Sequence, residues 1–283
     1  MSTVRTVLTI AALTLREASR RRVLLALAGL TVVLIGLSGW GFSRLAAEES
    51  MTSGESRLVA SILLNLVMFG FSLIAALGTA FLAGPTLAGE TESGIALTVL
   101  ARPVRRSAFL LGKWLGLVVF GTGFVVVAGL AQCLVVRATA DYWPPEPAAA
   151  FALLAAETTV LLTLAVLLST VISPMASGVV AVGLFGATWV AGVVGGIGES
   201  LDNESIARVG TLSRIVLPTD GLWRGAMHAF QDPTALAQFG TEDGVAFPFL
   251  SAAPLTLTYL AWAAVWVAMI WGLAATSFLR KDL

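Results

Sequence analysis

The sequence has one cysteine, Cys133, and one histidine, His228, among its 283 residues. A single cysteine forms no intramolecular disulfide, and the two residues together supply no Cys/His set for a metal. Cys133 lies in an apolar run, which favours a buried hydrophobic role. A Ser-His-Asp hydrolase would have to use His228 as its base, and this residue lies in a long loop. The sequence therefore predicts no metal site and no catalytic residues.

Nucleotide-binding signatures are absent as well. The pattern G-x-x-x-x-G-K-[ST] does not occur, and its nearest fragment, residues 111–114, lacks both the earlier glycine and the final Ser/Thr. We expect no ATP binding and no other cofactor in this chain. The formal net charge is zero, so bulk charge points to no particular partner, and no nucleic acid partner is expected.

Charge is scarce along the whole chain. Only 12% of residues are charged, against about a quarter in soluble domains, and 57% are hydrophobic with a mean hydropathy of +0.90. A membrane span needs about 20 apolar residues. Six stretches qualify, at about Val23–Phe42, Leu58–Ala83, Phe109–Val136, Phe151–Ile172, Ala176–Ile197 and Leu255–Phe278. The sequence therefore predicts an all-α integral membrane protein with six transmembrane helices and the lipid bilayer as its surroundings.

The placement of Lys and Arg predicts the orientation. Most basic residues fall in the segments on one side: Arg5, Arg16, Arg20, Arg21, Arg22, Arg102, Arg105, Arg106, Lys113, Arg280 and Lys281. Most acidic residues fall in the loops on the other side. We therefore expect an inner (plasma) membrane protein with both termini in the cytoplasm.

Two segments outside the spans have helical patterns. Residues 1–22 have an apolar stripe at helical spacing, which favours an amphipathic interfacial helix over a simple basic flank: Val4, Val7, Leu8, Ala11, Leu15 and Ala18. Residues 198–254 form the longest outer loop. Its apolar pieces at Ile206–Leu217 and Leu222–Phe230 are too short to span, so we expect short helices at, or dipping into, the outer leaflet.

The segment of residues 84–108, between the second and third spans, carries unusually dense charge. Glu90 and Glu92 suit the start of a helix, and Pro103 would break it. The apolar positions of this expected short helix are Ile95, Leu97, Val99 and Leu100. It could dock into a groove on a soluble partner, or the segment could be an ordinary basic inner loop, and composition does not separate the two.

Ionisable residues inside spans mark functional sites. Glu157 is the one clear candidate, either as a substrate or proton site or, as we favour, as a structural acid paired with Arg137. Asn65 and Gln132 are typical of contacts between helices. Gly192 and Gly196 form a G-x-x-x-G pattern that fits either a dimer contact or packing within the chain.

The charged segment resembles the E-x-x-x-G…L-x-x-P-x-x-R…G-K pattern of ABC-2 type transporter permeases. Glu90 and Gly94 match the first element, with Ile95 in place of the usual threonine. The remaining matches are Leu100, Pro103, Arg106, Gly112 and Lys113. The amphipathic leader, the six spans and the long fifth loop extend the resemblance over nearly the whole chain.

A second stretch, residues 217–224, resembles the P-[ST]-D-x-x-[WY]-R pattern of the subgroup that includes the permease of the nitrous-oxide-reductase maturation transporter. The matching residues are Pro218, Asp220, Trp223 and Arg224. The outer loops offer no cysteine and one histidine for work on a metal centre.

The resemblance implies a single transmembrane domain over residues 1–283 that acts as the permease of an ATP-binding cassette exporter. It would pair with a second copy or a related permease and dock separate P-loop ATPase subunits, which would bind ATP and Mg²⁺. Residues 84–108 would hold the coupling helix. Its interface residues would be Glu90, Glu92, Gly94, Leu97, Leu100, Pro103, Arg105, Arg106 and Lys113.

Spans two and five would line the pathway, with Asn65, Phe69 and Trp189 as candidate residues. Their apolar character is compatible with hydrophobic cargo but equally typical of any span. Two alternatives remain open at this point. One is a scaffold that uses ATPase strokes for extracytoplasmic assembly or maturation through the outer loop, and the other is an ion-coupled secondary transporter that uses Glu157.

Overall fold

The computed structural model describes residues 3–47, 52–84, 89, 105–234, 248–251 and 253–280. These residues contain α-helices and no strand, which confirms the all-α prediction. The main helices are α1 (Thr3–Ala18), α2 (Arg22–Ala46), α3 (Ser53–Gly84), α6 (Arg106–Ala140), α7 (Pro147–Val171), α8 (Pro174–Ser200), α9 (Glu204–Val216), α10 (Thr219–Phe230) and α12 (Leu257–Leu279).

Six of these helices, α2, α3, α6, α7, α8 and α12, are long and apolar enough to cross a membrane, so the six predicted spans are confirmed. The chain is an integral membrane protein. Several helices exceed their predicted bounds. At 1.5 Å per residue, the 35 residues of α6 would extend well beyond the roughly 30 Å of hydrocarbon in a bilayer. One or both ends of α6 therefore project outside the apolar layer.

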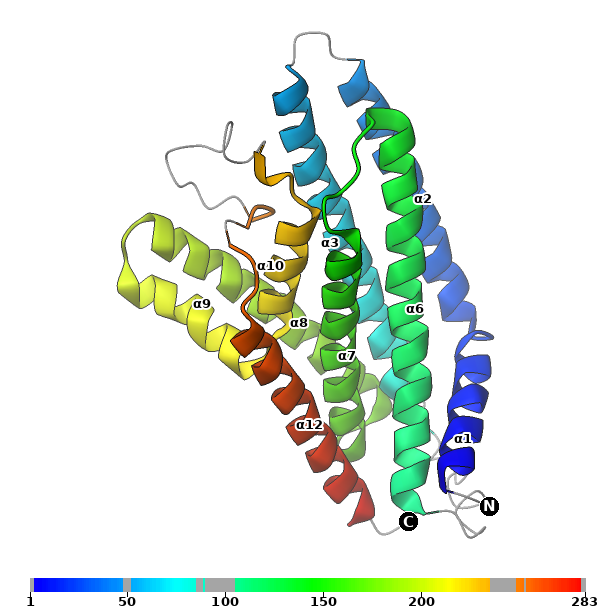
Figure 1. Cartoon of the computed structure of the whole chain (residues 1–283). Coiled ribbons are helices and arrows are strands. Elements are labelled where there is room, and N and C mark those ends of the chain that lie inside the picture. The colour runs from blue at the N-terminus through cyan, green and yellow to red at the C-terminus, as the bar shows by residue number, and fades with distance from the viewer. Residues whose placement is uncertain are drawn as a thin grey trace.

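Figure 1 shows the long helices as a bundle with both chain termini at the same end. Helices α3 and α7 lie in its interior and are the most buried spans, whereas α2 at the edge is almost entirely exposed to the surroundings. In a bilayer those surroundings are lipid, so the apolar surface of α2 needs no protein partner. Helix α1 runs beside the first turns of α6. Its place at the membrane surface stays a prediction.

Several helices begin at a proline or at a residue whose side chain caps the first turn. Pro147 and Pro174 begin α7 and α8, where a missing N–H costs nothing. The Asn203 side chain accepts from the Ile206 N–H at the start of α9, and the Thr256 side chain accepts from the Tyr259 N–H at the start of α12. The turn between α7 and α8 is short and lies between Val171 and Pro174.

The fifth span is followed by two short helices, as predicted, but their setting differs from a surface location. Helix α9 folds back along α8 through glycines: a Cβ at Gly195 would lie 2.6 Å from Gly210 Cα. Helix α10 is buried on nearly all sides against α7, α8 and α3. It is inserted into the bundle rather than lying at the outer surface, because its polar side, with Thr219 and Asp220, is buried together with its apolar residues.

Candidate functional site

The outer-loop motif forms a buried ion cluster, which we define as Arg214, Asp220 and Arg224. Asp220 Oδ2 accepts from Arg214 Nε at 3.0 Å and from Arg224 Nε at 3.1 Å. The Asp220 side chain is 1% exposed, and both arginines are largely buried. Arg224 also donates to the Gly192 carbonyl on α8 at 2.6 Å. The cluster therefore ties the end of α9, the start of α10 and the middle of α8 together.

Local sequence explains this arrangement. Asp220 stands in the first turn of α10, where a carboxylate is favoured by the helix dipole. The carboxylate occupies the space that a side chain at residue 192 would need, so Gly192 is required for the cluster to form. Gly192 of the G-x-x-x-G pattern thus packs within the chain. The Thr219 and Thr188 hydroxyls, 3.0 Å apart, add a second link between α10 and α8.

Three aromatic side chains of α12 donate hydrogen bonds to the last carbonyls of α9. Tyr259 Oη donates to the Arg214 carbonyl at 3.0 Å, Trp262 Nε1 to Ile215 at 3.2 Å, and Trp266 Nε1 to Val216 at 2.8 Å. The last carbonyls of a helix have no partner within it, and a low-dielectric setting makes this costly. Sequence reasoning missed these residues, although their spacing of three and four residues puts them on one helix face.

The candidate pathway residues lie in an aromatic group between α3, α8 and α10. The Phe69 ring lies 4.7 Å from the Trp189 ring and 5.5 Å from the Trp223 ring, measured between centroids. Asn65 is fully buried and donates to the Phe249 carbonyl at 2.9 Å. These contacts support packing inside one chain. A role of these three residues in a pathway stays a prediction.

Glu157 lies in the interior of α7 and is 1% exposed. One carboxyl oxygen accepts from the Ser72 hydroxyl at 2.8 Å, and the other has no hydrogen-bond partner in the described part of the chain. The predicted pairing with Arg137 is wrong: the Arg137 guanidinium lies over the Trp143 ring, 5.6 Å from its centroid. Cation–π contact with a neighbouring tryptophan satisfies this arginine locally.

At the end of the bundle that holds the termini, α1 crosses α6 closely. A Cβ at Gly112 would lie 2.6 Å from Ile10 Cβ, and one at Gly116 would lie 2.7 Å from Thr14 Cβ. Only glycine allows the two backbones this approach. The G-x-x-x-G spacing of Gly112 and Gly116 is the sequence signal for this crossing, whereas the family resemblance involves Gly112 alone, as part of a G-K element.

An ion-pair group reinforces the same crossing. Glu17 Oε1 accepts from Arg21 at 2.7 Å, and Glu17 Oε2 lies 3.5 Å from Lys113 Nζ. Burial alone would raise the pKa of Glu17, but the hydrogen bond from Arg21 and the charge of Lys113 outweigh it and hold the pKa below its usual value. Lys113 is 7% exposed, so its charge is directed inward to α1.

Most of the predicted coupling residues, Glu90, Glu92, Gly94, Leu97, Leu100 and Pro103, lie outside the described residues. Arg105 and Arg106 stand at the start of α6, where Arg106 Nη1 donates to the Leu279 carbonyl at 3.4 Å. The structure thus brings the start of α6, the α1 helix and the end of α12 to one end of the bundle.

A half-open apolar cavity of about 510 Å³, which we call the α3–α8 cavity, lies between the end of α3 and the start of α8. It is lined by Leu77, Phe81, Pro174, Met175, Gly178, Val179 and Val182. These are the second and fifth spans, the two expected to face a pathway. The three candidate pathway residues are not among those that line it. Among the described residues, no three His, Cys, Asp or Glu side chains gather closely enough to hold a metal.

The described residues form an all-helical bundle with six helices long and apolar enough to cross a membrane, which defines an integral membrane protein. The family model described as ABC-2 family transporter protein matches residues 8–283, so the chain belongs to this family. Such permeases are membrane transport components, normally work with ATPase partners and are not themselves catalytic. The search of curated proteins found no match.

Proposed function

We propose that this chain is the permease subunit of an ATP-binding cassette exporter, oriented with both termini in the cytoplasm. Separate P-loop ATPase subunits, which bind ATP and Mg²⁺, dock at residues 84–108. A second copy or a related permease completes the pathway. The observation that carries the proposal is the matched family together with the basic end of the bundle, where α1, the end of α12 and the start of α6, which follows that segment in the chain, meet.

A direct mechanical connection leads from the proposed joint to the pathway. Gly84 ends α3, is the first residue of the coupling segment, and packs on the start of α8, where an added Cβ would lie 2.8 Å from Ser177 Oγ. Pro174 lies in the same contact and also lines the α3–α8 cavity. A push from the ATPases on residues 84–108 would therefore move α3 against α8 and change this cavity. Its apolar lining fits hydrophobic cargo.

Co-purification tests the proposal. The tagged chain, extracted in detergent from its native host, is expected to bring a P-loop ATPase with it. The double variant Glu90→Ala/Arg106→Ala is expected to lose most of that ATPase, because it removes two charges from the proposed docking segment. The measurement is the amount of ATPase per permease by quantitative mass spectrometry.

The matched control is Glu204→Ala/Arg208→Ala, which removes an exposed ion pair on α9. It is expected to retain the ATPase. Thermal unfolding of each variant checks that Arg106→Ala has not disturbed the contact with the end of α12. A well-folded wild-type chain that retains no ATPase would overturn the proposal.

The scaffold alternative relies on Asp220, Trp223 and Arg224 as an extracytoplasmic tool. The structure turns these residues inward: Asp220 and Trp223 are both buried. Their contacts hold α10 inside the bundle and leave little of them available to an external client. We therefore favour transport over assembly, and we treat the subgroup resemblance of residues 217–224 as a likeness in sequence alone.

One carboxyl oxygen of Glu157 has no hydrogen-bond partner among the described residues. This observation motivates a test of the ion-coupled alternative. Glu157→Gln is expected to change stability by less than about 1 kcal/mol, because glutamine keeps an acceptor for Ser72. ATP hydrolysis by the purified complex is expected to continue at nearly the wild-type rate. Ser72→Ala serves as a control that removes only the hydrogen-bond partner. Loss of transport by a folded Glu157→Gln complex that still hydrolyses ATP would support the ion-coupled alternative.

A further inference from the structure

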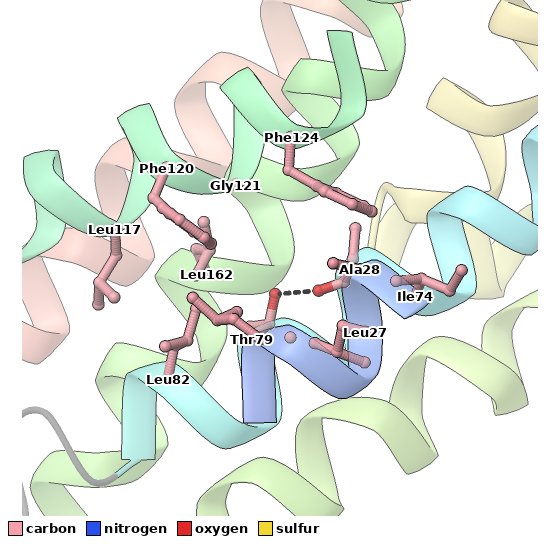
Figure 2. A pocket seen from close by; sticks show the side chains of 13 residues that line it. Leu27, Ala28, Ile74, Thr79, Leu82, Leu117, Phe120, Gly121, Phe124 and Leu162 are labelled. Atoms are coloured by element: carbon pink, nitrogen blue, oxygen red, sulfur yellow. Dashed lines mark hydrogen bonds between the residues drawn. The ribbon is translucent and has the colours of Figure 1, made fainter. Parts of the chain in front are cut away.

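A second apolar cavity lies on another side of the bundle, between α2, α3, α6 and α7. It has a volume of about 180 Å³. Figure 2 shows side chains from all four helices directed toward this space, with Leu27 on α2, Leu82 on α3, Phe120 on α6 and Leu162 on α7. It shares no lining residue with the α3–α8 cavity, so it is a separate site.

The chemistry of the wall excludes a polar ligand. Thr79 is the one polar side chain among the lining residues, and its hydroxyl already donates to the Ala75 carbonyl at 2.9 Å. The lining side chains therefore offer no free hydrogen-bond donor, and their acceptors are limited to the lone pairs of this one hydroxyl. Apolar cavities of about 150 Å³ stay dry and take up small hydrocarbons such as benzene. The cavity is therefore suited to a segment of hydrocarbon chain.

The cavity is accessible from the edge of the bundle. Helix α2 forms one wall and is the most exposed span; Ala28 on this wall is exposed and Leu24 is partly exposed. In a bilayer the surroundings of α2 are lipid acyl chains. An unfilled cavity costs stability in proportion to its volume, so an acyl chain that enters it replaces lost contacts.

A cationic turn lies at one end of the cavity. Leu24, in the wall, follows Arg22 by two residues, and Arg20 and Arg22 are both exposed. Neither has an ion pair within the described ranges, whereas Arg21 is bound to Glu17. Guanidinium groups bind phosphate in a bidentate manner, and basic residues beside a span attract anionic lipids. The turn is therefore placed to bind the head group of a lipid whose chain fills the cavity.

We propose that this cavity binds one acyl chain of an anionic phospholipid, with the lipid phosphate held by Arg20 and Arg22. The proposal requires only that the chain lies in a membrane and does not depend on the ATPase partners. Such a lipid would fill the space between α2 and the interior helices α3 and α7. It would fix the edge helix α2 to the rest of the bundle.

Photocrosslinking tests the site. Purified, delipidated protein in detergent is mixed with phosphatidylglycerol that carries a diazirine in one acyl chain, and crosslinked peptides are identified by mass spectrometry. Crosslinks are expected on the lining residues of α2, α3 and α6. Phosphatidylcholine with the same labelled chain is expected to crosslink several-fold less, and Arg20→Gln/Arg22→Gln is expected to lower the phosphatidylglycerol signal to that level.

A filling variant provides the second arm. An added Cβ at Gly78 makes only an ordinary contact, 3.4 Å from Leu27 Cδ1, so Gly78→Leu can place its side chain in the cavity. Excluding about two methylenes of the lipid chain corresponds to roughly tenfold weaker crosslinking. Gly36→Leu is the matched control. Gly36 lies on α2, Gly78 lies on the neighbouring α3, and an added Cβ at Gly36 would have no atom within 4 Å.

Ala28→Phe fills the cavity from its exposed wall and keeps the test decisive if Gly78→Leu does not fold. Equal crosslinking in wild type and a folded filling variant would overturn the cavity assignment. Equal crosslinking of phosphatidylglycerol and phosphatidylcholine to the wild type would overturn the anionic assignment. A signal spread evenly over all exposed helices would overturn both.

Discussion

Asp220→Ala is expected to destabilise the folded chain by about 3–5 kcal/mol, the cost of removing one partner from a buried ion pair. Arg214 and Arg224 would keep their charges inside the bundle without the carboxylate that both now contact. Helix α10 would lose its main polar attachment to α9. The measurement is the free energy of unfolding in mixed detergent micelles, followed by loss of helical signal.

Glu204→Ala provides the matched control, because it also removes a carboxylate from a short ion pair with an arginine. That pair lies at the surface, with Glu204 80% and Arg208 69% exposed, and surface pairs contribute at most about 1 kcal/mol. Asp220→Asn is expected to fall between the two, since an amide oxygen still accepts a hydrogen bond. Equal stability of Asp220→Ala and Glu204→Ala would show that the cluster does not hold α10 in place.

Gly112→Val/Gly116→Val is expected to separate α1 from α6. Each added side chain would meet α1 atoms closer than van der Waals contact allows, with Val7 O 2.9 Å from a Cβ at Gly112 and Ala11 O 2.7 Å from one at Gly116. Backbone atoms cannot rotate away as a side chain does, so overpacking costs about 1–3 kcal/mol at each site. The contact between Glu17 and Lys113 is expected to break with it.

Limited trypsin digestion measures this separation. Cleavage at Arg16, in the last turn of α1, requires local opening of the helix. The double variant is expected to be cut there much faster than the wild type. Gly123→Val is the control on the same helix, because nothing lies within 4 Å of a Cβ at Gly123. Unchanged cleavage in the double variant would mean that the crossing is not what holds α1.

Only some residues of the candidate site could be predicted from the sequence. The pattern at residues 217–224 identified Asp220, Trp223 and Arg224, but gave no indication that Arg214, six residues before Asp220, completes the ion cluster. Glu157, in the fourth span, was expected to pair with Arg137, which directly follows the third span. Instead each has a closer partner, Trp143 and Ser72 respectively. Such choices depend on helix rotation, which hydropathy does not specify.

The six spans and their approximate limits follow from the sequence alone, because a bilayer leaves an apolar run little choice but a helix that satisfies its own backbone groups. The basic segments likewise predict an orientation, and the motif predicts a place for ATPases to dock. The tertiary structure decided which faces of these helices meet. It inserted α10 into the bundle, aligned Tyr259, Trp262 and Trp266 with the end of α9, and left the cavity beside α2. Inside a bilayer nearly every face of a span is apolar, so hydrophobicity does not select which helix packs against which. Close packing at glycines and a few buried polar contacts make that selection.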